Sequence, residues 1–251
     1  MQNDSSVLIT HFLAVLEFLG TFAFAISGIR HAAAKNFDWF GGFICGVAVA
    51  IGGGTIRDLL LGVRPFWMLD PIYMICTFLA QLFLVVFARY VERLDNTWFV
   101  FDTIGLALFT IVGMQKSLDM GYPFWIAVIM GTMTGSAGGV IRDVLLNNVP
   151  VIFHKEIYAM ASVLGGCLFW LMNYLSVDMR ISATITFIII VAIRFLAVRY
   201  HLSLPILHLE RTQQKMIDRI RHSGRHSHNE HDRKTHTDGR IALFRHAEER
   251  A

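Results

Sequence analysis

Long apolar stretches alternate with short polar connections along most of the chain. A bilayer core of roughly 30 Å is crossed by a helix of about 20 apolar residues, and seven stretches of the chain come near or exceed that length. These stretches cover 8–29, 38–62, 68–88, 98–115, 123–146, 151–175 and 181–202. The connections between them are too short to hold a soluble domain. The pattern therefore predicts an all-α membrane protein with seven transmembrane helices.

The sequence also overlays on itself without a gap when it is shifted by 85 residues. Between 16–83 and 101–168, 17 of 68 positions are identical, and the longest run of matches aligns 53–61 with 138–146. Each unit contains three expected spans, so the second unit must begin on the opposite side of the membrane from the first. We therefore expect an inverted repeat of three plus three helices, followed by one extra helix.

These patterns divide the chain into segments. We expect the first three-helix repeat in 1–90, the inverted second repeat in 91–175, a seventh transmembrane helix in 176–204 and a cytoplasmic tail in 205–251. The tail is basic, polar and rich in histidine, so we expect most of it to be disordered. Its first part, 206–222, has the composition of an amphipathic helix, and we expect that helix to contact anionic lipid.

Charge predicts how the chain is oriented. Basic and acidic residues cancel over 1–202, so the net charge of +3 lies in the tail. The positive-inside rule places the side of the membrane with more Lys and Arg in the cytoplasm. The richer side holds Arg30, Lys35, Arg89, Arg93 and the tail, and the other side holds Arg64, Lys116 and Arg180. We predict a multi-pass protein of the cell's inner (plasma) membrane, with the N-terminus outside and the C-terminus cytoplasmic.

Two of the expected spans carry glycine clusters at equivalent positions. They contain Gly52, Gly53 and Gly54 in the second span, and Gly135, Ser136, Gly138 and Gly139 in the fifth. Each glycine weakens a helix by about 1 kcal/mol relative to alanine. We therefore expect both helices to be broken here, with freed carbonyls that coordinate a cation. The alternative is a packing seam, because small residues recur at every fourth position.

Charged residues follow both glycine clusters inside apolar sequence. Arg57-Asp58 and its copy Arg142-Asp143 are neighbours along the chain, and neighbours on a helix do not face each other. We therefore expect pairs across the two-fold axis, Arg57 with Asp143 and Arg142 with Asp58. The alternative is that these charges lie near span ends, extend to the membrane interface and join the two halves.

Glu17 and Asp102 are equivalent under the same shift. A carboxylate deep in an apolar span is a candidate for a functional group, because its charge is expensive in the bilayer. It could attract cations or take up a proton. The alternative is that each carboxyl is protonated or bonded to another helix.

The doubled motifs Gly-Gly-Gly-Thr-Ile-Arg-Asp (52–58) and Gly-Gly-Val-Ile-Arg-Asp (138–143) resemble the prokaryotic branch of the trimeric intracellular cation (TRIC) channel family. The resemblance covers about 8–202. It implies a homotrimer in which each subunit has its own pore, lined by broken second and fifth helices. It also implies conduction of monovalent cations, mainly potassium with some sodium. Ala137 departs from the repeat, which has Gly52 there.

Three classes of function remain. The first is a potassium-permeable channel in which Glu17, Asp58, Asp102 and Asp143 favour cations. The second is a secondary transporter of a small amino acid such as glycine, because some members of the same family are labelled glycine transporters. The third is a scaffold or membrane enzyme, which no nucleophile–base pair or cofactor signature supports.

The expected partners follow from the same features. We expect membrane lipid, no nucleic acid, no enzymatic activity, and no cofactor or bound metal apart from permeant potassium or sodium ions. Cys45, Cys76 and Cys167 lie in apolar stretches, so we expect three small buried side chains and no disulfide framework.

Overall fold

The computed structural model describes residues 2–88, 97–153, 157–200 and 202, with side chains described from residue 8 onward. These residues form seven α-helices and two short 3-10 turns. The elements in chain order are α1 Gln2–Ala34, α2 Trp39–Leu60, η1 Phe66–Met68, α3 Ile72–Val86, α5 Thr97–Asp119, α6 Phe124–Leu145, η2 Val151–Phe153, α7 Ala159–Tyr174 and α8 Met179–Arg199. The expected tail, 205–251, lies outside the described residues.

Five helices are long and apolar enough to cross a membrane: α2, α5, α6, α8 and residues Leu8–Ala34 of α1. The other two apolar helices, α3 and α7, have 15 and 16 residues and are shorter than expected. Their expected spans began at 68 and 151, but η1 and η2 occupy those ends of the spans as 3-10 turns. The predicted all-α fold with seven helices is confirmed.

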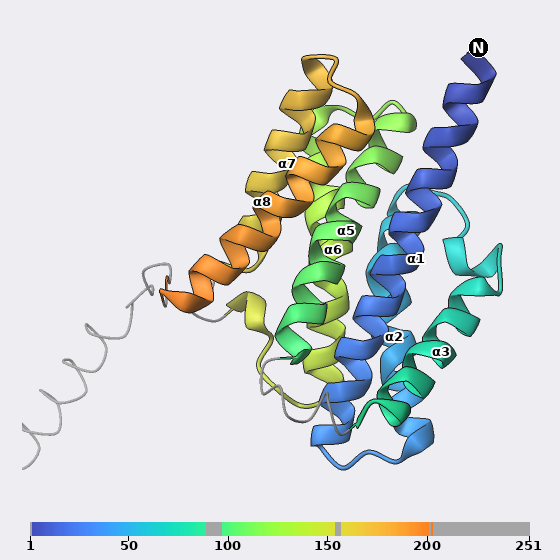
Figure 1. The fold of residues 1–251 in the computed structure, drawn as a ribbon, viewed down its shortest axis with the longest axis vertical. Helices are drawn as coiled ribbons and strands as arrows, with labels where there is room; N and C mark the ends of the chain where they lie inside the picture. The colour runs from blue at the N-terminus through green and yellow to red at the C-terminus, as the bar shows by residue number, and fades with distance from the viewer. Residues whose placement is uncertain (1, 89–96, 154–156, 201, 203–251) are drawn as a thin grey trace, which may run out of the picture. The chain divides into compact units, whose positions relative to one another are not determined.

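The two triple-helix units run in opposite directions (Figure 1). α1 descends from the N-terminus in the view. α5, which is the equivalent helix of the second repeat, ascends beside it. The repeat extends to the loops, because Asn36 and Gly121 share a left-handed backbone, as do Gly62 and Asn147. Asparagine and glycine tolerate this conformation best, and it ends a helix. The inverted arrangement is thus specified in the connections as well as in the spans.

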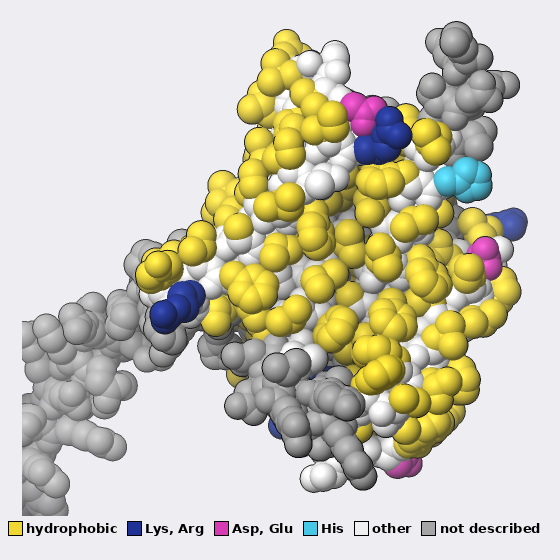
Figure 2. All heavy atoms as spheres, viewed as in Figure 1, with side chains coloured by type: hydrophobic (Ala, Val, Ile, Leu, Met, Phe, Trp, Pro, Cys, Tyr) yellow, Lys and Arg dark blue, Asp and Glu magenta, His cyan; other side chains and the backbone are white. Residues whose placement is uncertain are grey.

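The surface is apolar and several of the largest buried side chains are charged. Hydrophobic side chains cover most of the face in Figure 2, over α1, α5 and α8. Arg57, Arg142 and Arg194 are fully buried, at 0% exposure. A membrane-spanning bundle has this distribution, because lipid faces the outside and charge must be paired within the protein.

Candidate functional site

The glycine clusters lie where α2 crosses α6. Both helices are continuous through their glycines, so the expectation of broken helices is wrong. A Cβ added at Gly53 would collide with the carbonyl oxygen of Thr134, and one at Gly138 would lie 2.6 Å from that of Val49. These two contacts are equivalent under the repeat. The glycines therefore let two backbones touch, and that packing outweighs their low helix propensity.

The remaining members of the glycine clusters are also packed against neighbours. A Cβ at Gly52 would meet Ile141, one at Gly54 the ring of Phe66, one at Gly135 the carbonyl of Leu106, and one at Gly139 the hydroxyl of Tyr158. Ser136 donates to the carbonyl of Thr132 in its own helix at 2.7 Å. The seven predicted hinge residues thus form a close-packed seam.

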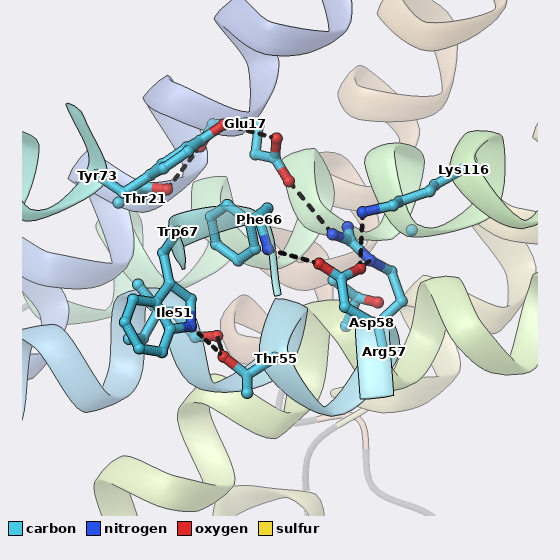
Figure 3. Close-up of polar contacts among 12 residues, drawn as sticks. Glu17, Thr21, Ile51, Thr55, Arg57, Asp58, Phe66, Trp67, Tyr73 and Lys116 are labelled. Carbon is cyan, nitrogen blue, oxygen red and sulfur yellow. Dashed lines mark hydrogen bonds and ion pairs between the residues drawn. The ribbon is translucent and has the colours of Figure 1, made fainter. Parts of the chain in front are cut away.

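The first charge cluster joins Glu17, Arg57, Asp58 and Lys116, and we call it the Glu17 cluster (Figure 3). Arg57 donates from Nε to Asp58 at 2.7 Å and from Nη2 to Glu17 at 3.3 Å. Lys116 comes from the other repeat and donates to Asp58 at 2.8 Å. The cluster is buried except at Glu17 and Lys116, whose side chains are 14% and 32% exposed.

Neutral donors complete the Glu17 cluster. The hydroxyl of Tyr73 donates to Glu17 at 2.9 Å, and the backbone N–H of Phe66 donates to Asp58 at 2.8 Å. The ring of Phe66 also lies 5.7 Å from the guanidinium carbon of Arg57. Both carboxylates are therefore held by charged and neutral donors together, which is what a buried charge requires.

The second cluster joins Asp102, Arg142, Asp143 and Ser27, and we call it the Asp102 cluster. Arg142 donates to Asp102 at 2.5 Å, to Asp143 at 2.9 Å and to the hydroxyl of Ser27 at 2.8 Å. The backbone N–H of Val151 donates to Asp143 at 3.0 Å. The Arg142–Asp102 and Arg142–Asp143 bonds repeat those of Arg57, 85 residues later in the chain. This cluster is almost fully buried, with Asp102 and Asp143 at 1% and 3% exposure.

The expected pairing of Arg57 with Asp143, and of Arg142 with Asp58, is wrong. Each arginine binds the aspartate that follows it and the carboxylate on the first helix of its own repeat. The rule against neighbouring pairs describes where side chains leave a helix, but an arginine is long enough to fold back at the helix end. The links between repeats are instead Lys116 to Asp58 and Arg142 to Ser27.

The two clusters balance their charges differently. The position equivalent to Lys116 is His31, which bonds the carbonyl of Ser27 at 3.1 Å and packs against Trp98. The Asp102 cluster is instead approached from α8 by Arg194, whose guanidinium carbon lies 4.6 Å from the ring of Tyr158. The sequence reasoning did not assign Lys116 or Tyr73 to a site. The tyrosines repeated at an offset of 85 residues, Tyr73 and Tyr158, were the signal in the sequence that could have identified Tyr73.

Two cavities are present on the bundle. One, of about 380 Å³, is an almost entirely apolar hollow between α1, α5 and α8. The other, of about 220 Å³, lies between α1, α2 and α3 and includes Arg30, Asp38 and Gln81. Neither is lined by a member of either charge cluster.

Within the described ranges, no three His, Cys, Asp or Glu side chains come close enough to hold a metal ion. Cys45 and Cys76 are buried free thiols, as expected, but Cys167 is exposed. The expectation for Cys167 is wrong because it lies on a face of α7 that no other described helix covers. An exposed side chain within an apolar helix is compatible with lipid contact.

The chain matches a known protein family and is similar to individual membrane proteins. A family model described as "Glycine transporter" matches residues 14–89 and again 99–174, with the two matches at the offset of the internal repeat. The chain is 38% identical over 199 residues to the UPF0126 inner membrane protein YadS of Escherichia coli K12, covering 78% of this chain and 96% of that protein. It is 36% identical over 210 residues to a UPF0126 membrane protein of Vibrio cholerae, covering 81% and 86%.

The chain is also similar to solved structures of trimeric intracellular cation channels. The chain is similar to the trimeric intracellular cation channel orthologue from Rhodobacter sphaeroides, with a TM-score of 0.72 and 30% identity over 76% of this chain and 99% of that one. It is similar to a prokaryotic TRIC channel solved in 0.5 M KCl, with a TM-score of 0.70 and 30% identity over 78% and 100%. A trimeric intracellular cation channel from C. elegans shares the fold alone, at 14% identity and a TM-score of 0.54.

Proposed function

The chain belongs to the prokaryotic TRIC channel family, and from that premise we propose that it is a cation channel with a pore through each subunit. The observation that carries the proposal is the pair of buried carboxylate–arginine clusters. They lie toward opposite ends of the bundle, one near the ends of α2 and α5 and the other near the ends of α6 and α1. Charge retained in duplicate inside a membrane protein is typical of an ion route.

The proposed route runs between the two repeats, from the Glu17 cluster to the Asp102 cluster, beside the glycine seam of α2 and α6. The carboxylates attract cations and repel anions, and the arginines keep both clusters close to neutral so that a cation can leave again. Because the helices are continuous, ordinary helical carbonyls are engaged within their helices. Selectivity for potassium over sodium therefore rests on side chains and on water along the route.

Assembly and placement complete the proposal. We propose a homotrimer, like the channels whose structures it resembles, in the inner membrane with the N-terminus outside. The tail would contact anionic lipid on the cytoplasmic side. Mass measurement of the detergent-solubilised protein tests the trimer, and reporter fusions after residues 36 and 121 test the orientation, because these loops should lie on opposite sides.

Single-channel recording of the full chain in planar bilayers tests the function. We expect discrete ohmic potassium currents. Glu17→Gln should weaken the preference for potassium over chloride, because it removes a charge and keeps the shape. Asp70→Asn is the matched control, since Asp70 is an exposed carboxylate that accepts a hydrogen bond from the backbone N–H of Ile72 and belongs to neither charge cluster. Equal effects of both variants would remove the Glu17 cluster from the route.

The name of the matching family model favours a second candidate, a secondary transporter of glycine. A transporter would show saturable uptake of labelled glycine into vesicles and no unitary current. The same reconstituted protein therefore decides between the two functions.

A further inference from the structure

Between the two charge clusters lie two stacked aromatic rings, Phe24 of α1 and Phe109 of α5. The rings are nearly parallel, at 12°, with centroids 5.4 Å apart, and both residues are 1% exposed. They are equivalent under the repeat, so the pair lies on the pseudo-two-fold axis itself. Each ring lies on a glycine of the other repeat: Gly20 faces Phe109, and Gly105 faces Phe24.

The spacing along each helix places this pair midway between the clusters. On α1 the order is Glu17, Phe24, His31, and on α5 it is Asp102, Phe109, Lys116, each step being seven residues. Seven residues are about two helical turns and about 10 Å. Each helix thus carries one cluster on one side of its phenylalanine and reaches the other cluster on the other side.

We infer that the stacked Phe24–Phe109 pair is the hydrophobic gate of the proposed pore. This inference rests on the proposed function. A dry apolar constriction stops a hydrated ion because neither ring replaces the water that the ion must lose. The glycines opposite the rings let them close flat against each other without an intervening side chain. Opening requires the rings to separate far enough for water to enter between the clusters.

A near-isosteric pair of variants separates sealing by apolarity from packing alone. Phe109→Leu and Phe109→Asn remove similar volume, but only asparagine can be hydrated. In potassium-loaded vesicles containing the full-length protein, we expect Phe109→Asn to raise potassium efflux roughly tenfold, equivalent to about 1.4 kcal/mol in the barrier. Phe109→Leu should stay close to the unaltered protein. Phe169, which is equally buried but lies outside the stack, provides the control variant Phe169→Asn, expected to leave efflux per folded protein unchanged.

Two results would overturn the gate. If Phe109→Leu and Phe109→Asn raise efflux equally, lost packing rather than hydration explains the leak. If neither raises it while the protein remains monodisperse, the stack is not on the route. Should Phe109→Asn fail to fold, Phe24→Tyr adds one hydroxyl to a ring of the stack without removing volume, and the same increase is expected.

The unaltered protein keeps the two proposals distinguishable. Unitary current without any dependence on these variants refutes the gate and leaves the channel. Absence of unitary current in the unaltered protein refutes the channel itself.

Discussion

The Glu17 and Asp102 clusters are built from the same repeated motif but are finished by different neighbours. Tyr73 donates to Glu17, and Lys116 reaches Asp58 from a position that is partly exposed. In the Asp102 cluster, the hydroxyl of the equivalent Tyr158 has no hydrogen-bond partner among the described residues, and Ser27 takes part instead. The repeat supplies an arginine and two carboxylates to each cluster, whereas the neighbouring residues determine how exposed each cluster is to solvent.

The two clusters therefore differ in how exposed they are to solvent. The Glu17 cluster has a polar edge through which water can enter. The Asp102 cluster is almost fully buried, and Arg194 of α8, a helix with no counterpart in the repeat, packs beside it. An inverted repeat therefore need not have two equivalent ends, because Arg194 of the extra helix packs on Tyr158 beside one cluster only.

The largest effect should come from removing the arginine of the Asp102 cluster. Arg142→Met leaves Asp102 and Asp143 buried without their shared cation, and breaking a buried pair costs about 3–5 kcal/mol. Arg57→Met should cost less, because Lys116 still neutralises Asp58 and Glu17 is partly exposed. Thermal unfolding in detergent measures both. Equal losses of stability would show that the two clusters are equally buried in solution.

The glycine seam is where the repeats should behave alike. Gly53→Ala and Gly138→Ala each push a Cβ into a backbone carbonyl of the facing helix, and overpacking of this kind costs about 1–3 kcal/mol. Gly42→Ala is the control, because its added Cβ would only meet Ile29 at 3.8 Å. Similar thermal shifts at 53 and 138, with none at 42, are expected. A large shift at only one of the two would break the symmetry of the seam.

These cases show what the sequence could predict. Apolar stretches and the shift of 85 residues were enough for the helices and the inverted repeat, because both follow from membrane thickness and from counting. Helix breaking at Gly52–Gly54 was wrong because propensity is weak beside the packing of α2 on α6. The pairing of Arg57 was wrong because the direction in which a side chain leaves a helix does not fix where a long guanidinium ends. The contribution of Lys116 needs the tertiary fold.

The equivalent tyrosines, Tyr73 and Tyr158, should differ in how much their hydroxyls contribute to stability. Tyr73→Phe removes a hydrogen bond to the carboxylate of Glu17, which is partly exposed, so we expect a cost of about 1 kcal/mol. Tyr158→Phe removes a buried hydroxyl that bonds no described residue, so stability should stay level or rise. Differential scanning fluorimetry of both variants checks the sign. A loss at Tyr158 as large as that at Tyr73 would mean that its hydroxyl is bonded in solution.

The smallest effect is expected where α8 begins. Asp178 is exposed and caps this helix, and its hydrogen bonds from the side chain and backbone of Arg180 hold the pKa of its carboxyl below the usual value. A lowered pKa stabilises the fold above the usual pKa of aspartate, and that contribution is lost as pH falls toward the folded value. Asp178→Ala should therefore lower the melting temperature slightly at neutral pH and not at all at strongly acidic pH. Asp178 precedes the first turn of α8, whereas Arg194 lies near the other end of that helix. Combining Asp178→Ala with Phe24→Tyr should therefore change efflux no more than Phe24→Tyr does. A larger change would mean that fraying at the first turn of α8 affects the Asp102 cluster, which lies near the other end of that helix.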